Sequence, residues 1–222
     1  MFIGHDDGDG AVVGQFHVGR HKDGKPVAAS SWRVTTRMQH VADALVGYYE
    51  NSILAGKAKD GRAAEVVTGC DRVPILLVGQ RAVTLRMMLK GAGEVFHSCD
   101  GYRFLDPAPQ YGEPCGCPST LGERKSAAAT GRGPVPETRI RFRLAELPNI
   151  GMFVLNSSSW AFAEEVPQLT HALGTVSEPV RCVLRYDMVE FTTRSGVDVS
   201  YRRPIVELAG MHFGGESVEL AA

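Results

Sequence analysis

Four side chains that bind metal ions well lie close together in the middle of the chain. His97 and Cys99 are two residues apart, and in a strand this spacing puts both side chains on one face. Cys115 and Cys117 follow in a tight Pro-Cys-Gly-Cys-Pro turn. Zinc prefers four thiolate or imidazole ligands in a tetrahedron, so the sequence predicts a structural Zn2+ site formed by these four residues.

Two other interpretations of the cysteines stay open. Cys70 competes with His97 for the fourth ligand position, and the thiols could instead be small buried apolar groups, as we expect for Cys182 in its apolar strand. A zinc deaminase would carry a glutamate two residues after the histidine, where this chain has Cys99. Because that proton-carrying carboxylate is missing, any metal site should be closed and structural.

No motif in the sequence predicts an enzyme. The chain lacks the glycine-rich phosphate loops, the nucleophile elbow and the paired histidines of zinc proteases. Its carboxylates are scattered along the chain. We therefore expect no catalytic residue and no enzymatic activity.

Basic side chains form a second candidate site, on a strand expected at residues 138–144. Apolar and β-branched residues alternate there with arginines, so the arginines share one face while the other residues need a core. The arginine face could contact phosphates or an acidic protein surface, and a plain solvated strand face is the alternative. The expected partner-binding residues are Arg139, Arg141, Arg143, Arg124 and Lys125, with Arg132 adding charge nearby.

The elements that must position these residues are mostly strands. Alternating and β-branched runs predict strands on both sides of residues 97–134, and turns at 100–101 and 194–196 predict hairpins. We expect an α+β fold, mainly antiparallel sheet with a few helices and a cysteine-bearing insertion. An OB-like barrel with a zinc loop is the alternative. Trp32 and Trp160 should pack in the core rather than anchor a partner.

Helical spacing occurs in three segments. Residues 37–49 carry one apolar face, and Thr120 with Glu123 forms a capping box that begins a helix over 120–129. The third segment, 160–173, contains Pro167, and an interior proline costs about 3 kcal/mol. We therefore expect a break or kink there, with the regular helix starting near Pro167.

Length and composition favour a single domain. The chain has 222 residues, of which 44% are hydrophobic, and this suits one folded α+β domain over residues 12–210 with a cysteine insertion at 97–134. Residues 1–11 and 211–222 are expected to be a flexible N-terminus and a flexible tail.

Charge and hydropathy exclude several classes of partner. The formal net charge of −1 argues against binding to naked DNA through a broad basic surface. No apolar run reaches the roughly 18 residues that a membrane span needs, and the acidic start of the chain lacks the parts of a signal peptide. We therefore expect a cytoplasmic protein, in which thiols stay reduced and clustered cysteines tend to bind metal.

Several segments resemble one known family, in the same order, between residues 12 and 210. They are 24–36, 97–101, 114–125, 131–134, 140–144, 151–160, 189–193 and 199–201, with Pro204. This pattern resembles the recombination directionality factors of actinobacterial phages, which act on large serine integrases. Residues 1–11 depart from the longer leader of that family.

The resemblance implies a protein that does no chemistry, because the integrase carries the nucleophilic serine and cuts the DNA. Its partner would be the integrase on attachment-site DNA, near the integrase's zinc-binding and coiled-coil region, with little autonomous DNA binding and no membrane. Such a factor activates attL × attR excision and inhibits attP × attB integration in the cytoplasm of the host bacterium. The alternative is a single-stranded DNA-binding protein of phage replication, which would use the arginine face on an OB-like barrel.

Overall fold

A computed structural model describes most of the chain. The described residues are 11–18, 20–22, 25–27, 31–56, 62–91, 94–106, 110–131, 133–192, 196 and 198–208. Residues 1–10 and 211–222, which were predicted to be flexible, lie outside these ranges. Arg132 and residues 194–195 of the second predicted turn also lie outside them.

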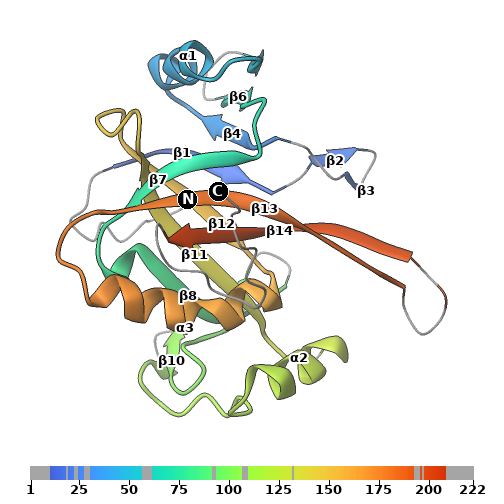
Figure 1. The fold of residues 1–222 in the computed structure, drawn as a ribbon. Helices are drawn as coiled ribbons and strands as arrows, with labels where there is room; N and C mark the ends of the chain where they lie inside the picture. Colours follow the sequence, from blue (N-terminus) through green and yellow to red (C-terminus); the bar gives the residue numbers. More distant parts are fainter. Residues whose placement is uncertain are drawn as a thin grey trace, which may run out of the picture.

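Strands make up most of the described chain (Figure 1). They are β1 (Val12–His17), β2 (Arg20–Lys22), β3 (Lys25–Val27), β4 (Arg33–Thr36), β5 (Ile53–Ala55), β6 (Ala64–Val67), β7 (Arg72–Leu77), β8 (Val83–Gly91), β9 (Glu94–Cys99), β10 (Phe104–Asp106), β11 (Val135–Leu144), β12 (Met152–Ser157), β13 (Val180–Thr192) and β14 (Asp198–Leu208). The helices are α1 (Gln39–Tyr48), α2 (Leu121–Ala129) and α3 (Trp160–Gly174), with a short 3-10 helix η1 (Gln80–Ala82).

The described strands form one open, mixed sheet of 12 strands and a separate β2–β3 pair. The main path runs β10-β9-β8-β11-β12-β1-β4-β6-β5, and β7, β13 and β14 branch from β11. Among the described pairs only β1 with β12 is parallel, so the α+β prediction with a mainly antiparallel sheet is confirmed. The OB-like barrel is wrong, because the described path ends at β10, β5 and β14 without closing.

Strand β11 connects the two parts of the sheet. It pairs with β8 on one edge and β12 on the other, and its last two residues, Arg143 and Leu144, pair with Leu76 and Ile75 of β7. The strands β7, β13 and β14 thereby form a second layer, which crosses in front of β1 and β12 in Figure 1. The predicted alternation explains how one strand serves both layers, because its inward residues are buried throughout.

The core lies between these two layers and is rich in aromatic rings. Phe16 is fully buried, and its ring centroid lies 5.9 Å from Trp32, 5.2 Å from Phe142 and 5.5 Å from Phe153. Trp32 also stacks on Tyr186 of β13 at 3.8 Å and is fully buried. The prediction that Trp32 is a core residue is therefore confirmed.

The helices occupy their predicted places, with one correction. Helix α1 buries Val41 and Leu45, and α2 begins with the predicted capping box. The predicted break at Pro167 is wrong, because α3 is one helix that contains this residue. Val166 and Leu169 flank the proline and are both 4% exposed, so burial on each side, at about 1.5–3 kcal/mol per large apolar side chain, offsets the proline cost.

Strand pairing confirms both predicted hairpins and assigns one segment whose pattern is ambiguous. The segment 84–89, whose run of Met, Met and Leu suits a strand or a helix, lies within β8. The hairpin around 100–101 forms between β9 and β10, and the hairpin around 194–196 forms between β13 and β14. None of the helices in the described ranges is both long and apolar enough to cross a lipid bilayer.

Phe16→Ala should lower the free energy of unfolding by about 3–5 kcal/mol, because it removes a buried ring and leaves a cavity. The matched control is Phe96→Ala, since Phe96 is 57% exposed; its loss should stay below about 1 kcal/mol. Urea denaturation followed by circular dichroism measures both. Equal losses for the two variants would contradict a core centred on Phe16.

Candidate functional site

The predicted metal ligands come together at one end of the sheet. His97 and Cys99 lie at the end of β9, and Cys115 and Cys117 lie in the loop between β10 and α2. One ligand atom from each of the four residues lies within 4.8 Å of the others. Two pairs lie especially close: Cys99 Sγ is 3.7 Å from Cys117 Sγ, and Cys117 Sγ is 3.3 Å from His97 Nε2.

This spacing fits a tetrahedral metal ion. A tetrahedron with metal–sulfur bonds of about 2.3 Å places neighbouring sulfurs about 3.8 Å apart. The four residues could therefore hold a metal ion, with His97 in the fourth position. Cys70 takes no part in the cluster; its thiol lies 3.5 Å from the Thr68 hydroxyl, where it packs against the main core. Cys182 is buried in the main core, as predicted.

Turn chemistry brings the two halves of the cluster together. In the turn after β9, Asp100 Oδ1 accepts hydrogen bonds from the backbone N–H groups of Tyr102 and Arg103, both at 2.8 Å. The Cys115 N–H then donates to the Tyr102 carbonyl at 2.9 Å, which ties the cysteine turn to the hairpin. Gly116, at φ 70°, adopts the left-handed conformation that lets the chain reverse between the two cysteines.

The Arg124 side chain holds the loop and the turn together through hydrogen bonds to three backbone carbonyl groups. Its Nε donates to the Pro118 carbonyl at 2.6 Å, and its Nη2 donates to the carbonyls of Gly101 at 3.0 Å and Ser119 at 3.1 Å. The side chain is 6% exposed and also lies over the Tyr102 ring, 5.8 Å from its centroid. The Arg124 guanidinium is thus bonded to the loop itself. The neighbouring Lys125 of α2 is exposed and can contact a partner.

Burial dominates the electrostatics of the cluster. Burial raises the pKa of the Cys99 thiol well above its usual range, and the neighbouring Cys115 and Cys117 raise it further. Burial also raises the pKa of Cys117 and lowers the pKa of His97. A metal ion supplies the positive charge that stabilises thiolates in such a site.

Apolar side chains close the cluster off from the main core. Met87 is buried against the cysteines, and Phe104, Leu121 and Trp160 are half-buried around them. Trp160 was predicted to be a core residue; it packs on this small cluster instead of the main core. The sequence signal for that contact is weak, because Trp160 lies 43 residues beyond the second cysteine of the turn (160 − 117).

The arginine row of β11 lies in the sheet beside β12. Arg139 is exposed, whereas Arg141 and Arg143 are half-buried, and Arg143 donates to the Pro148 carbonyl at 3.2 Å. The Nε of Arg141 is covered and has no acceptor in the described part of the chain. Arg124 does not belong to this row, because its side chain is buried against the carbonyl groups of the cysteine loop.

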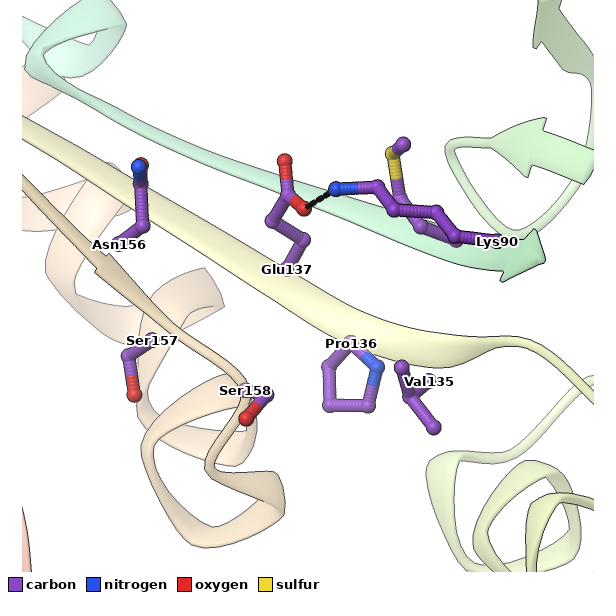
Figure 2. Close-up of a pocket in the computed structure, with 8 residues that line it drawn as sticks. Lys90, Val135, Pro136, Glu137, Asn156, Ser157 and Ser158 are labelled. Atoms are coloured by element: carbon purple, nitrogen blue, oxygen red, sulfur yellow. Dashed lines mark hydrogen bonds and ion pairs between the residues drawn. The ribbon is translucent and has the colours of Figure 1, made fainter. Parts of the chain in front are cut away.

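A shallow hollow of about 290 Å³ borders the row along β8, β11 and β12 (Figure 2). Figure 2 shows Lys90 paired with Glu137 across it, so the two charges neutralise each other. Sequence reasoning missed this hollow and also a larger cleft beside it that contains Arg33 and Arg202. No spacing rule could have found the cleft, because its residues come from separate strands and helices.

Comparison with known families adds the last observation on this site. A family model described as Gp3-like, recombination directionality factor-like, matches residues 13–209. The chain belongs to this recombination directionality factor-like family. The matched residues include the His–Cys cluster and the arginine row of this chain. No solved structure matches the chain.

The factor should bind one divalent metal ion per chain through the cluster. Titration of chelator-treated protein with Zn2+ or Co2+ measures this. Cys117→Ser should weaken binding by more than about 100-fold, because even the outer partners of metal ligands contribute 10- to 100-fold. Cys70→Ser is the matched control and should bind normally. A loss of binding in both variants, or no binding by the unaltered chain, would refute the four-residue ligand set.

Arg124→Gln should lower the free energy of unfolding by about 2–4 kcal/mol, because it leaves buried carbonyl groups without donors. The neighbouring Lys125→Gln, which alters an exposed side chain, should change it by no more than about 0.5 kcal/mol. Chemical denaturation of the metal-loaded protein compares the two. Equal effects would show that the guanidinium does not hold the loop.

Proposed function

We propose that this chain is a recombination directionality factor for a phage-encoded large serine integrase. It binds the integrase on attachment-site DNA, activates attL × attR excision and inhibits attP × attB integration. The observation that carries the proposal is the family match, which spans residues 13–209 and so includes both sheet layers and the cysteine insertion.

The proposed mechanism is a shift between two arrangements of the integrase complex. A bound protein moves such an equilibrium only by as much as its affinities for the two arrangements differ. A 100-fold preference for the arrangement that recombines attL with attR corresponds to about 2.7 kcal/mol. No catalytic group is needed in the factor, which is proposed to be a cytoplasmic protein without enzymatic activity.

The contact residues proposed for the integrase are those of the arginine row. Arg139 is exposed, and Arg141 beside it is half-buried. The loop held by Arg124 adds a second contact at the cysteine insertion, whereas Lys125 lines the larger cleft. The metal is proposed to be zinc, since three thiols and one imidazole form a ligand set that zinc prefers, and its role is to hold that loop.

The deciding experiment is recombination in vitro by the cognate integrase on attL × attR and on attP × attB substrates. The factor should switch excision on and suppress integration. The double variant Arg139→Glu/Arg141→Glu should need at least about tenfold more protein for half-maximal excision, which corresponds to about 1.4 kcal/mol of binding free energy. The control Arg181→Glu alters an exposed arginine of β13 in the second layer and should act normally.

Two outcomes would contradict the proposal. The first is that the factor changes neither reaction. The second is tight, steeply salt-dependent binding to single-stranded DNA without any effect on recombination, which would favour the replication alternative. That alternative depended on an OB-like barrel, which the described strands do not form.

A further inference from the structure

The cleft that contains Arg33 and Arg202 is larger than the hollow of Figure 2 and has a one-sided charge. It measures about 780 Å³ and lies where β1 and β12 end and α3 begins, with β14 and α2 on its sides. Its lining includes three basic residues, Arg33, Lys125 and Arg202, and, among the described residues, no aspartate or glutamate. Because these residues come from β4, α2 and β14, only the tertiary fold brings their charges together.

The charges of this cleft are only partly neutralised. Arg33 pairs with Glu65 at 3.1 Å. Lys125 and Arg202 have no acidic partner within the described ranges of the chain. The Nε atoms of Arg33 and Arg202 are both covered and lack a hydrogen-bond acceptor there. Covering a cationic donor without an acceptor is costly, and an anion nearby offsets that cost.

The positive charge of the cleft also affects the pKa of His17. Its ring Nε2 lies 2.8 Å from the Thr35 hydroxyl, and the residue lines the cleft. Burial and the Arg33 charge lower the pKa of His17 to about 4, while Glu65 opposes them weakly. The ring is therefore neutral near pH 7, so the positive charge of the cleft comes from the arginines and the lysine.

Hydrogen-bond donors complete the lining. Ser157 and Ser158 are among the lining residues, and Ala161 belongs to the first turn of the 15-residue helix α3. The first backbone N–H groups of a helix carry partial positive charge. Donors that converge from several elements suit the oxygens of a phosphate, which point in different directions, better than the two coplanar oxygens of a carboxylate.

We infer that this cleft binds a backbone phosphate of the attachment-site DNA while the factor is held on the integrase. The inference rests on the proposed function, because the integrase is what brings the DNA to the cleft. One or two phosphate contacts are too few for binding to DNA alone, in keeping with the net charge of −1. Once the integrase holds both molecules, the contact becomes intramolecular and its effective concentration is high.

The test compares the unaltered factor with Lys125→Gln/Arg202→Gln in three binding measurements. Binding to integrase without DNA should stay within twofold. Binding to the integrase–attL complex should weaken by about tenfold at low salt, and the slope of log K against log salt should become shallower by about 1 for each phosphate that the variant no longer binds. The control Arg81→Gln/Arg181→Gln removes two exposed charges outside the cleft and should match the unaltered factor.

The third measurement identifies the source of the phosphate. Calorimetry with inorganic phosphate should detect no cleft-dependent binding at concentrations that leave the integrase–attL complex intact, whereas a free-phosphate site would show binding that the double variant lacks. Three results would overturn the inference: such free-phosphate binding, equal affinity of both proteins for the integrase–attL complex at every salt concentration, or weaker binding of the double variant to integrase without DNA. The last result would instead indicate an acidic segment of the integrase in the cleft.

The same measurements separate this inference from the proposed function. If the unaltered factor binds no integrase and alters no recombination reaction, the proposed function fails and the inference fails with it. If the factor switches recombination but the double variant behaves normally, only the inference about the cleft fails.

Discussion

The alternation of buried and basic residues in β11 is the constraint on which the rest of the structure depends. Ile140 and Phe142 must lie in a core, and this requirement turns one face of the strand toward the aromatic cluster around Phe16. The arginines that alternate with these residues must therefore lie on the opposite face of the strand. Because the same strand pairs with β8, β12 and β7, its burial pattern determines where both layers of the sheet meet.

The cysteine insertion depends on interactions that are independent of this core. Its loop is held by backbone hydrogen bonds and the Arg124 guanidinium, and its four clustered ligands could add a metal ion. The insertion also reaches the large cleft, since Trp160 packs on the cluster and lines the cleft, and Lys125 follows Arg124 on α2. The cluster and the cleft therefore share neighbouring residues.

The candidate surfaces differ in how they are held, and this suits a protein that works by differential binding. The arginine row stands on a central strand of the sheet, which gives it a rigid backbone. The cleft draws its residues from several separate elements. A factor that favours one arrangement of a partner needs contacts at more than one place, because a single contact can be kept in both arrangements.

The sequence by itself determined most of the local structure: the β11 alternation, the capping box of α2, the hairpin at Asp100-Gly101 and the four metal ligands with one competitor. Each of these is set by residues within a few positions of one another, where spacing decides which side chains share a face. Only the tertiary structure placed His97, and not Cys70, beside the three cysteines, kept α3 whole across Pro167 and buried Arg124. It also assembled the basic cleft from Arg33, Lys125 and Arg202. The physical reason is that these outcomes depend on contacts between distant segments, and a periodic pattern shows which face is buried but not what covers it.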